Sequence, residues 1–356
     1  MDFSFSEEQL MLRSQARSLL EQRSPAERVV ELAESDTPWD QGLWKEMAGL
    51  GWTGLSIPEE DGGSGMGFLD EAVLFEELGY ALYPGPYFAS VALALPVLRG
   101  DSESLSSLAS GELTVTLAPA PSGARASRSG EGWSLEGNVE LVPDVGICNA
   151  AVVPAESADG EGLWLVSLDA DGVEARSLGT MDATRRLGEL RLSGAPVKML
   201  AEPGGAAPIL DAIARRAGAA VALEAVGIAQ RALDLALEHT KTREQFGKPI
   251  GSYQAVSHQV ADTYMDVELT RSLAYWAAWC VAEDDDRVDV AVPAAKSAAA
   301  EAAVRACERS IQVHGGIGFT WEHILHRLYK RAQWLESFNG YGHAQRAIVA
   351  TSLLGR

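Results

Sequence analysis

The amino-acid sequence predicts an α+β protein made of an N-terminal helical domain, a small middle β-barrel or sandwich and a C-terminal four-helix bundle. Three observations lead to this prediction. Apolar residues recur at the helical period over residues 1–112. Residues 113–202 instead hold short β-prone runs, separated by clusters of Gly, Pro, Ser and Asp about every 8 to 12 residues. The helical period returns over residues 206–356 in long segments with short connections, which is typical of a bundle.

Polar residues mark the start of the first helix. Ser6 has the short side chain of an N-cap, and Glu7 and Glu8 place negative charge at the positive end of the helix dipole. Three more helices are predicted at about residues 39–49, 68–82 and 91–98. The glycine-rich segment 57–67 is expected to be a surface loop, because it follows no clear strand and lacks the Lys-Ser/Thr of a phosphate-binding loop.

The middle domain contains short runs such as LTVTLA, WSLEGNVELV, AAVVPA and GLWLVSL. Their β-branched and aromatic residues are typical of strands. A linker at Pro203-Gly204-Gly205 separates them from the bundle. The bundle helices are predicted to end near residue 241 and to span about 253–282, 291–313 and 323–354, the last with a break at Gly340.

The overall composition limits the partners and the compartment. The chain has 356 residues and a formal net charge of -21, which disfavours nucleic acids and anionic membranes because both attract Lys and Arg. Cys148, Cys280 and Cys307 are widely spaced, so neither a disulfide framework nor a metal site is expected. The N-terminus is amphipathic and charged, unlike a signal peptide, and no run approaches the roughly 20 apolar residues of a membrane span. We expect a soluble cytoplasmic protein.

The first functional signal is the stretch TREQFGKPIGSYQ, residues 242–254, which we call the first connector. Glycine costs about 1 kcal/mol and proline about 3 kcal/mol inside a helix, so residues 247–251 must join two helices. An ordinary turn between helices explains this composition. A nucleotide site also explains it, because Arg243 offers donors suited to phosphate oxygens and Phe246 offers a flat surface beside them.

The second signal is IQVHGGIGF, residues 311–319, which we call the second connector. Gly315 as the C-cap of a helix is the ordinary explanation. Three glycines in this stretch also allow a ligand to approach the backbone closely. His314 is expected to be a hydrogen-bonded structural residue rather than a base.

Together, the two connectors and the order of the domains resemble the acyl-CoA dehydrogenase family, over the whole chain and most strongly in its last third. The resemblance implies α,β-desaturation of an acyl-CoA thioester with hydride transfer to FAD. In that family the flavin lies between the β domain and the bundle, and its ADP half reaches a neighbouring subunit. The matching cofactor-binding positions of this chain are Arg243, Gln245, Phe246, Ile250, Tyr253, Gln312, Gly315 and Gly316.

The sequence departs from the family at the catalytic base. Most members carry a glutamate 27 positions after the glutamine of the second motif, where this chain has Asn339. Other members carry it 26 positions before the motif arginine, where this chain has Ala217. An amide is no base near neutral pH. Two acids nearby are weak candidates: Glu336, and Glu224, which a salt bridge to an arginine such as Arg271 or Arg305 would equally explain.

The β domain also departs from the family pattern. Residues 117–123, LAPAPSG, and 141–144, LVPD, stand where the family carries hydroxyl-rich segments that hold the flavin ring. Two roles therefore stay open: an active FAD-dependent acyl-CoA dehydrogenase, or a non-catalytic subunit that completes the FAD site of a longer relative in a heterotetramer. A CoA-ester-binding protein without flavin is a third possibility. The sequence does not identify the acyl chain.

Overall fold

The computed structural model describes residues 5–130 and 132–355 and divides into two compact units. The bundle unit comprises the residues up to Glu31, Phe68–Tyr83 and Gly218–Arg356. The sheet unit comprises Leu32–Gly67 and Pro84–Ala217. In the part of the chain that the structure describes, no helix has the length and apolar character needed to cross a membrane.

The N-terminal third is helical, as predicted. Its helices are α1 (Glu7–Arg23), α2 (Ala26–Glu34), α3 (Gln41–Gly49), α4 (Phe68–Tyr80), α5 (Leu95–Leu98) and α6 (Ser102–Ala109), with a π-helical segment at Phe88–Ala94. The Ser6 side chain accepts from the Gln9 amide, and the Gln9 side chain accepts from the Ser6 amide. This capping box confirms the predicted start of α1. The predictions for this third did not include α2 and α6.

The middle region forms a seven-stranded sheet. Its strands are β1 (Val115–Leu117), β2 (Arg125–Ser129), β3 (Gly132–Pro143), β4 (Ala150–Ser157), β5 (Gly160–Ser167), β6 (Val173–Ser177) and β7 (Leu187–Ala201). The pairings β4–β2, β2–β3, β3–β7, β7–β5 and β5–β4 close into a ring, and β1 and β6 extend it. Leu135, Val139, Trp164 and Leu190 are fully buried in its core. The predicted small β-barrel is therefore confirmed.

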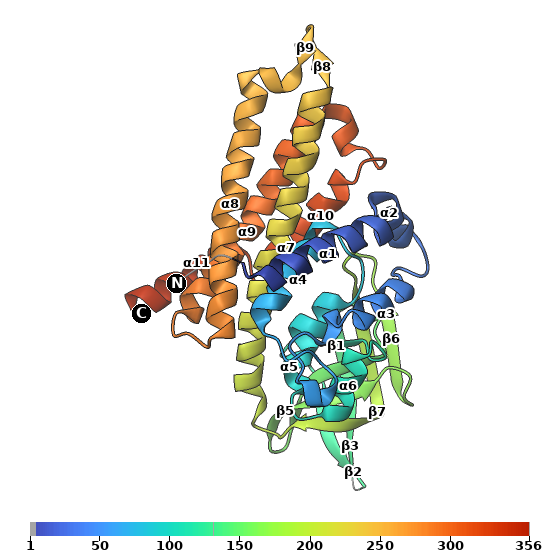
Figure 1. Cartoon of the computed structure of the whole chain (residues 1–356). Helices are drawn as coiled ribbons and strands as arrows, with labels where there is room; N and C mark the ends of the chain where they lie inside the picture. Colours follow the sequence, from blue (N-terminus) through green and yellow to red (C-terminus); the bar gives the residue numbers. More distant parts are fainter. Residues whose placement is uncertain (1–4, 131, 356) are drawn as a thin grey trace. The chain divides into compact units, whose positions relative to one another are not determined.

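The C-terminal region is the predicted helical bundle. Its helices are α7 (Ala206–Thr242), α8 (Gln254–Ala282), α9 (Val288–His314), α10 (Leu325–Ser337) and α11 (Gly342–Leu354). The break predicted at Gly340 separates α10 from α11, where Asn339 and Gly340 have φ of 51° and 95°. Figure 1 shows the long helices side by side, with the short strands β8 (Glu244–Gln245) and β9 (Lys248–Pro249) at one end of the bundle.

Helix α4 packs directly against α7 through two glycines. A Cβ atom added to Gly227 would lie 2.0 Å from the Glu76 carbonyl oxygen, and one added to Gly79 would lie 2.2 Å from the Glu224 carbonyl oxygen. No side chain fits at such distances, so the backbones of the two helices are in contact. This contact fixes the register of α4 on the bundle.

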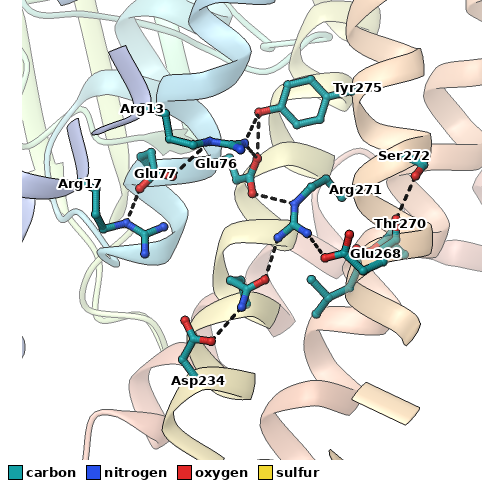
Figure 2. A network of polar contacts seen from close by, with 12 residues as sticks. Arg13, Arg17, Glu76, Glu77, Asp234, Glu268, Thr270, Arg271, Ser272 and Tyr275 are labelled. Carbon is teal, nitrogen blue, oxygen red and sulfur yellow. Dashed lines mark hydrogen bonds and ion pairs between the residues drawn. The ribbon is translucent and has the colours of Figure 1, made fainter. Parts of the chain in front are cut away.

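A polar network joins α1, α4, α7 and α8 inside the bundle unit (Figure 2). Glu76, which is 4% exposed, accepts from Arg13 Nη2 at 2.6 Å, Arg271 Nε at 3.0 Å and the Tyr275 hydroxyl at 2.8 Å. Burial together with the Glu76 charge raises the pKa of Tyr275 well above its ordinary value. The hydroxyl therefore stays protonated and can donate to the carboxylate.

The neighbouring acid Glu77 is 1% exposed and accepts from Arg17 Nε at 2.5 Å. Burial raises the pKa of Glu77, against the lowering effect of Arg17. Removing one member of such a pair leaves an uncompensated buried charge, so the network holds α1 against α4 in one arrangement.

Candidate functional site

The first connector leaves α7 at the end of the bundle and returns into α8. Its backbone turns sharply at Phe246 and Gly247, with φ of 54° and 80°. The Ile250 amide donates to the Arg243 carbonyl at 2.8 Å, and the Tyr253 hydroxyl donates to the Gln245 carbonyl at 3.0 Å. These bonds hold the connector in shape without using the Arg243 or Phe246 side chains.

The Arg243 and Phe246 side chains point away from the packed helices. Phe246 is 93% exposed, and Arg243 is exposed and pairs with no residue that the structure describes. The Phe246 ring contacts Tyr253 edge-on, with the ring centroids 6.4 Å apart. A left-handed backbone conformation costs free energy in a residue other than glycine, and the exposed Phe246 ring gains no burial in return. Strain of this kind is a common sign of a functional position.

The three glycines of the second connector differ: Gly315 caps a helix, Gly318 is tightly packed, and Gly316 has open space beside it. Gly315 ends α9 with φ of 65°, and its amide donates to the Gln312 and Ile311 carbonyls, so the predicted C-cap is confirmed. A Cβ added to Gly318 would lie 2.8 Å from His314 Cβ. No described atom lies within 4 Å of a Cβ added to Gly316, whose φ is outside the left-handed region. Folding therefore does not require glycine at position 316.

Three histidine rings contact one another at the end of the bundle that carries the two connectors. His239, in the last turn of α7, stacks on His314 at the end of α9 with centroids 4.3 Å apart, and His314 lies 4.7 Å from His323. His314 Nδ1 bonds to the Ser310 carbonyl at 2.8 Å, in line with the predicted structural role. Burial, followed by repulsion from neighbouring histidines and Arg231, lowers the pKa of His323 to about 4. At neutral pH this ring is uncharged.

Side chains from α9 and α11 form hydrogen bonds with the turn between α10 and α11. Lys296, which is 1% exposed, donates from Nζ to the Glu336 carbonyl at 2.8 Å and to the Gly340 carbonyl. Gln345 Nε2 donates to the Asn339 carbonyl at 2.6 Å. Burial lowers the pKa of Lys296 to about 8. The side chain of Asn339 is thus exposed on a firmly anchored turn.

Glu224 forms a buried ion pair with Arg331 Nη1; the two side chains are 4% and 0% exposed. Arg331 Nη2 also lies 3.5 Å from the Tyr83 carbonyl. The predicted salt bridge of Glu224 is confirmed, but its predicted partners were wrong. Arg271 instead contacts Glu76, and Arg305 contacts Asp266 at 3.1 Å.

Glu336 is partly buried near the end of α10, three residues before Asn339. Its backbone carbonyl accepts from Lys296, while its carboxylate makes no hydrogen bond or ion pair with the described residues. Ala217, at the other position where a base was sought, is fully buried. Of the two candidate acids, Glu336 is the one whose carboxylate is not committed to a buried ion pair.

In the sheet unit, the segments 117–123 and 141–144, which were predicted to depart from the family pattern, form hydrogen bonds with nearby backbone. Ser122 donates to the Pro154 carbonyl, and Thr116 donates to the Pro143 carbonyl at 2.6 Å. Asp144 accepts from the Arg186 amide at 3.2 Å. These groups hold neighbouring backbone segments within the sheet unit.

Sequence reasoning missed several residues that hold the site. Arg331 and Lys296 are both buried cations. His239 anchors its turn by ring stacking, and Gln345 anchors its turn by a hydrogen bond from its side-chain amide. A usable signal existed for Lys296, which is the only cation in the run VPAAKSAAAEAA. A cation in a run made mostly of alanine predicts a buried partner. The partner carbonyls, about 40 residues away, could not be read from the same pattern.

Comparisons with known proteins match most of the chain. Residues 213–354 match the acyl-CoA dehydrogenase C-terminal domain, and residues 6–104 match the N-terminal domain. The chain is 32% identical to acyl-CoA dehydrogenase FadE27 of Mycobacterium tuberculosis over 355 residues, which covers 94% of both chains. It is 33% identical to acyl-CoA dehydrogenase IpdE2 of the same species, covering 93% of this chain and 94% of the relative.

Solved structures of the same fold cover the chain completely or nearly so. The ChsE4-ChsE5 complex of Mycobacterium tuberculosis contains a chain that is 30% identical, with a TM-score of 0.90 and 100% of both chains covered. Butyryl-CoA dehydrogenase of Megasphaera elsdenii is 25% identical, with a TM-score of 0.90, covering 99% of this chain and 100% of the other.

Proposed function

Because this chain belongs to the acyl-CoA dehydrogenase family, we propose that its first and second connectors hold the ADP half of FAD in an enzyme that desaturates an acyl-CoA thioester. The family confirms the sequence-based predictions of an FAD-dependent oxidoreductase and of this fold. The assignment of individual residues to the cofactor is our proposal.

The observation that carries the assignment is that the first connector exposes the side chains of Arg243 and Phe246 at one end of the bundle. Arg243 presents a guanidinium suited to a diphosphate, and Phe246 presents a flat apolar surface suited to an adenine or ribose face. Gly316 leaves open space beside the backbone, where a nucleotide can approach closely. The chemistry of this set fits a dinucleotide. Gln245, Ile250, Tyr253, Gln312 and Gly315 complete the proposed surface.

Strong exposure of this surface supports a shared site. An aromatic ring that is 93% exposed and an arginine with no partner among the described residues lie at a bundle end, as expected if another subunit covers them. The relatives include one chain solved as the ChsE4-ChsE5 complex. We therefore propose that the chain works as a homo-oligomer or with a longer acyl-CoA dehydrogenase subunit, and that each connector pair contributes to a partner's FAD.

We propose participation in the reaction rather than a purely structural role, because relatives that match nearly the full length are themselves named acyl-CoA dehydrogenases. FAD, when bound, supplies the hydride acceptor. On this chain, Lys296 and Gln345 hold the turn that presents Asn339, whose amide can orient a substrate carbonyl but cannot take up a proton. Glu336 is our candidate for the proton-abstracting carboxylate.

Flavin content of purified variants tests the proposed cofactor surface. Arg243→Ala removes charge-assisted bonds worth about 1.5–3 kcal/mol, so FAD affinity should fall about 10- to 100-fold. The matched control is Arg99→Ala, which removes another exposed arginine, located in the sheet unit. Equal flavin content in the two variants would remove Arg243 from the site.

Two further measurements address the chemistry and the location. If Glu336 takes up the α-proton, Glu336→Gln abolishes bleaching of the flavin by an acyl-CoA while leaving FAD bound. Undiminished bleaching would exclude Glu336.

We also propose a cytoplasmic location, which the free thiols of Cys148, Cys280 and Cys307 support. Fractionation of producing cells tests this location.

A further inference from the structure

A cleft of about 210 Å³ opens in the bundle unit. It lies where the end of α1, the start of α2, the end of α4, the middle of α7 and the start of α10 meet. Its apolar lining comes from Leu20, Pro25, Ala26, Ala81, Leu82, Ile324 and Leu328. A mostly apolar cleft with a few convergent polar groups is the usual form of a small-molecule site.

The first polar group is the hydroxyl of Ser24, which lines the cleft. Ser24 is 4% exposed, and its Oγ makes no hydrogen bond with any residue that the structure describes. Its backbone amide is already bonded to the Leu20 carbonyl at 2.9 Å, so the residue is held in place. A buried hydroxyl without a partner carries a desolvation cost that a bound acceptor would remove.

The second polar group is Arg231, which is partly buried and also lines the cleft. Its Nη1 donates to the Tyr80 hydroxyl at 3.1 Å, and its guanidinium carbon lies 5.0 Å from the centroid of the Tyr80 ring. The Tyr80 hydroxyl donates in turn to Asp234 at 3.0 Å. Within the described chain, Arg231 forms no salt bridge to a carboxylate. It is therefore an oriented cation with donors to spare.

No acid around the cleft forms an ion pair with Arg231 in the described chain, and Asp234 reaches it only through the Tyr80 hydroxyl. Glu77 pairs with Arg17 at 2.5 Å and with Arg13 at 3.6 Å (Figure 2). Glu21 and Glu27 lie at the exposed rim, where water screens their charges. The inner part of the cleft thus combines a guanidinium and a hydroxyl with an apolar wall.

We propose that this cleft binds a small monocarboxylate with a short apolar body. The carboxylate pairs with Arg231 and accepts from Ser24 Oγ, while the body packs on Leu82 and Leu328. A cavity of about 150 Å³ holds benzene, so 210 Å³ corresponds to a ligand of about eight or nine heavy atoms. Benzoate and hexanoate have this size and charge.

The proposed site is separate from the turn that carries Asn339. Ile324 and Leu328 lie at the start of α10, whereas Asn339 follows its end. The 13-residue helix places these two ends about 20 Å apart. Occupancy of the cleft can therefore be measured without acyl-CoA and independently of turnover.

Isothermal titration of the full chain with benzoate, in the absence of acyl-CoA, tests the proposal. Benzoate should bind at least tenfold more tightly than benzyl alcohol, which has a similar body without the charge, and more tightly than inorganic phosphate, which lacks the body. Arg231→Gln should weaken benzoate binding at least tenfold, and the control Arg99→Gln should leave it unchanged.

Ser24→Ala separates a ligand contact from a folding contact. Because the hydroxyl has no partner in the described chain, its removal should leave the urea midpoint unchanged or higher, while benzoate binding weakens several-fold. The proposal is overturned if benzoate does not bind, if benzyl alcohol or phosphate binds equally well, or if Ser24→Ala and Arg231→Gln bind benzoate like the unaltered chain.

Discussion

The buried pair of Glu224 and Arg331 gives the sharpest prediction about this bundle. Arg331 is fully buried and Glu224 is 4% exposed, so water screens their charges little. Arg331→Met leaves the Glu224 carboxylate buried without its guanidinium. Breaking a pair of this kind costs about 3–5 kcal/mol, because the remaining charge keeps its desolvation penalty and loses its partner.

Urea unfolding measures this cost. With an m value of about 3 kcal/mol/M, the midpoint of Arg331→Met should fall by about 1 M or more. The double variant Glu224→Leu/Arg331→Met removes both charges and should recover most of the loss. Arg346→Met is the matched control, because it breaks an ion pair to Glu301 that is 57% and 30% exposed and should cost at most about 1 kcal/mol.

The same variants distinguish the structural role of Glu224 from a catalytic one. A structural role requires that Glu224→Gln lowers the urea midpoint in the same direction as Arg331→Met. A midpoint that stays within the error of the unaltered chain, together with loss of turnover and retained flavin, would refute the structural reasoning.

Three other predictions concern packing, the α10–α11 turn and pH. Gly227→Ala should cost about 1–3 kcal/mol, because its Cβ would lie 2.0 Å from a backbone oxygen, whereas Gly49→Ala, with nothing within 4 Å, should be nearly neutral in the same unfolding assay. Lys296→Met should speed hydrogen exchange of the amides following Asn339, because the turn loses two hydrogen bonds, and should leave exchange in the sheet unit unchanged. Unchanged exchange in the amides following Asn339 would count against the anchoring role of Lys296. Folding lowers the pKa of His323 from 6.5 to about 4, so the unfolded chain takes up the proton first and stability should fall by about 1–2 kcal/mol as pH falls from about 6.5 to 4. His323→Gln should flatten that slope, and an unchanged slope would contradict the assignment.

Much of the fold followed from local signals in the sequence. Ser6 predicted the start of α1 and Gly340 predicted the break before α11, because caps and helix breakers act within a few residues. The alternation of short runs predicted the barrel. Helix α2 was missed because it is only nine residues long, although Pro25 precedes it.

The candidate site was predictable only where its chemistry is local. Arg243 and Phe246 stand in one connector, so their residue types and spacing suggested a ligand. The partners that fix the surrounding turns are distant in sequence: Arg331 lies 107 residues from Glu224, and Lys296 reaches carbonyls 40 and 44 residues away. Which arginine meets a buried acid depends on helix packing. Arg271 and Arg305 were as plausible from sequence as Arg331.

The measurement that tests the central claim most directly is FAD binding by Gly316→Leu. Position 316 has open space and an ordinary backbone conformation, so the side chain should leave the urea midpoint unchanged. If the two connectors clasp the ADP half of the flavin, the added leucine occupies that space and purified protein should lose most of its FAD. A Gly316→Leu protein that folds normally and keeps its full flavin content would contradict the account.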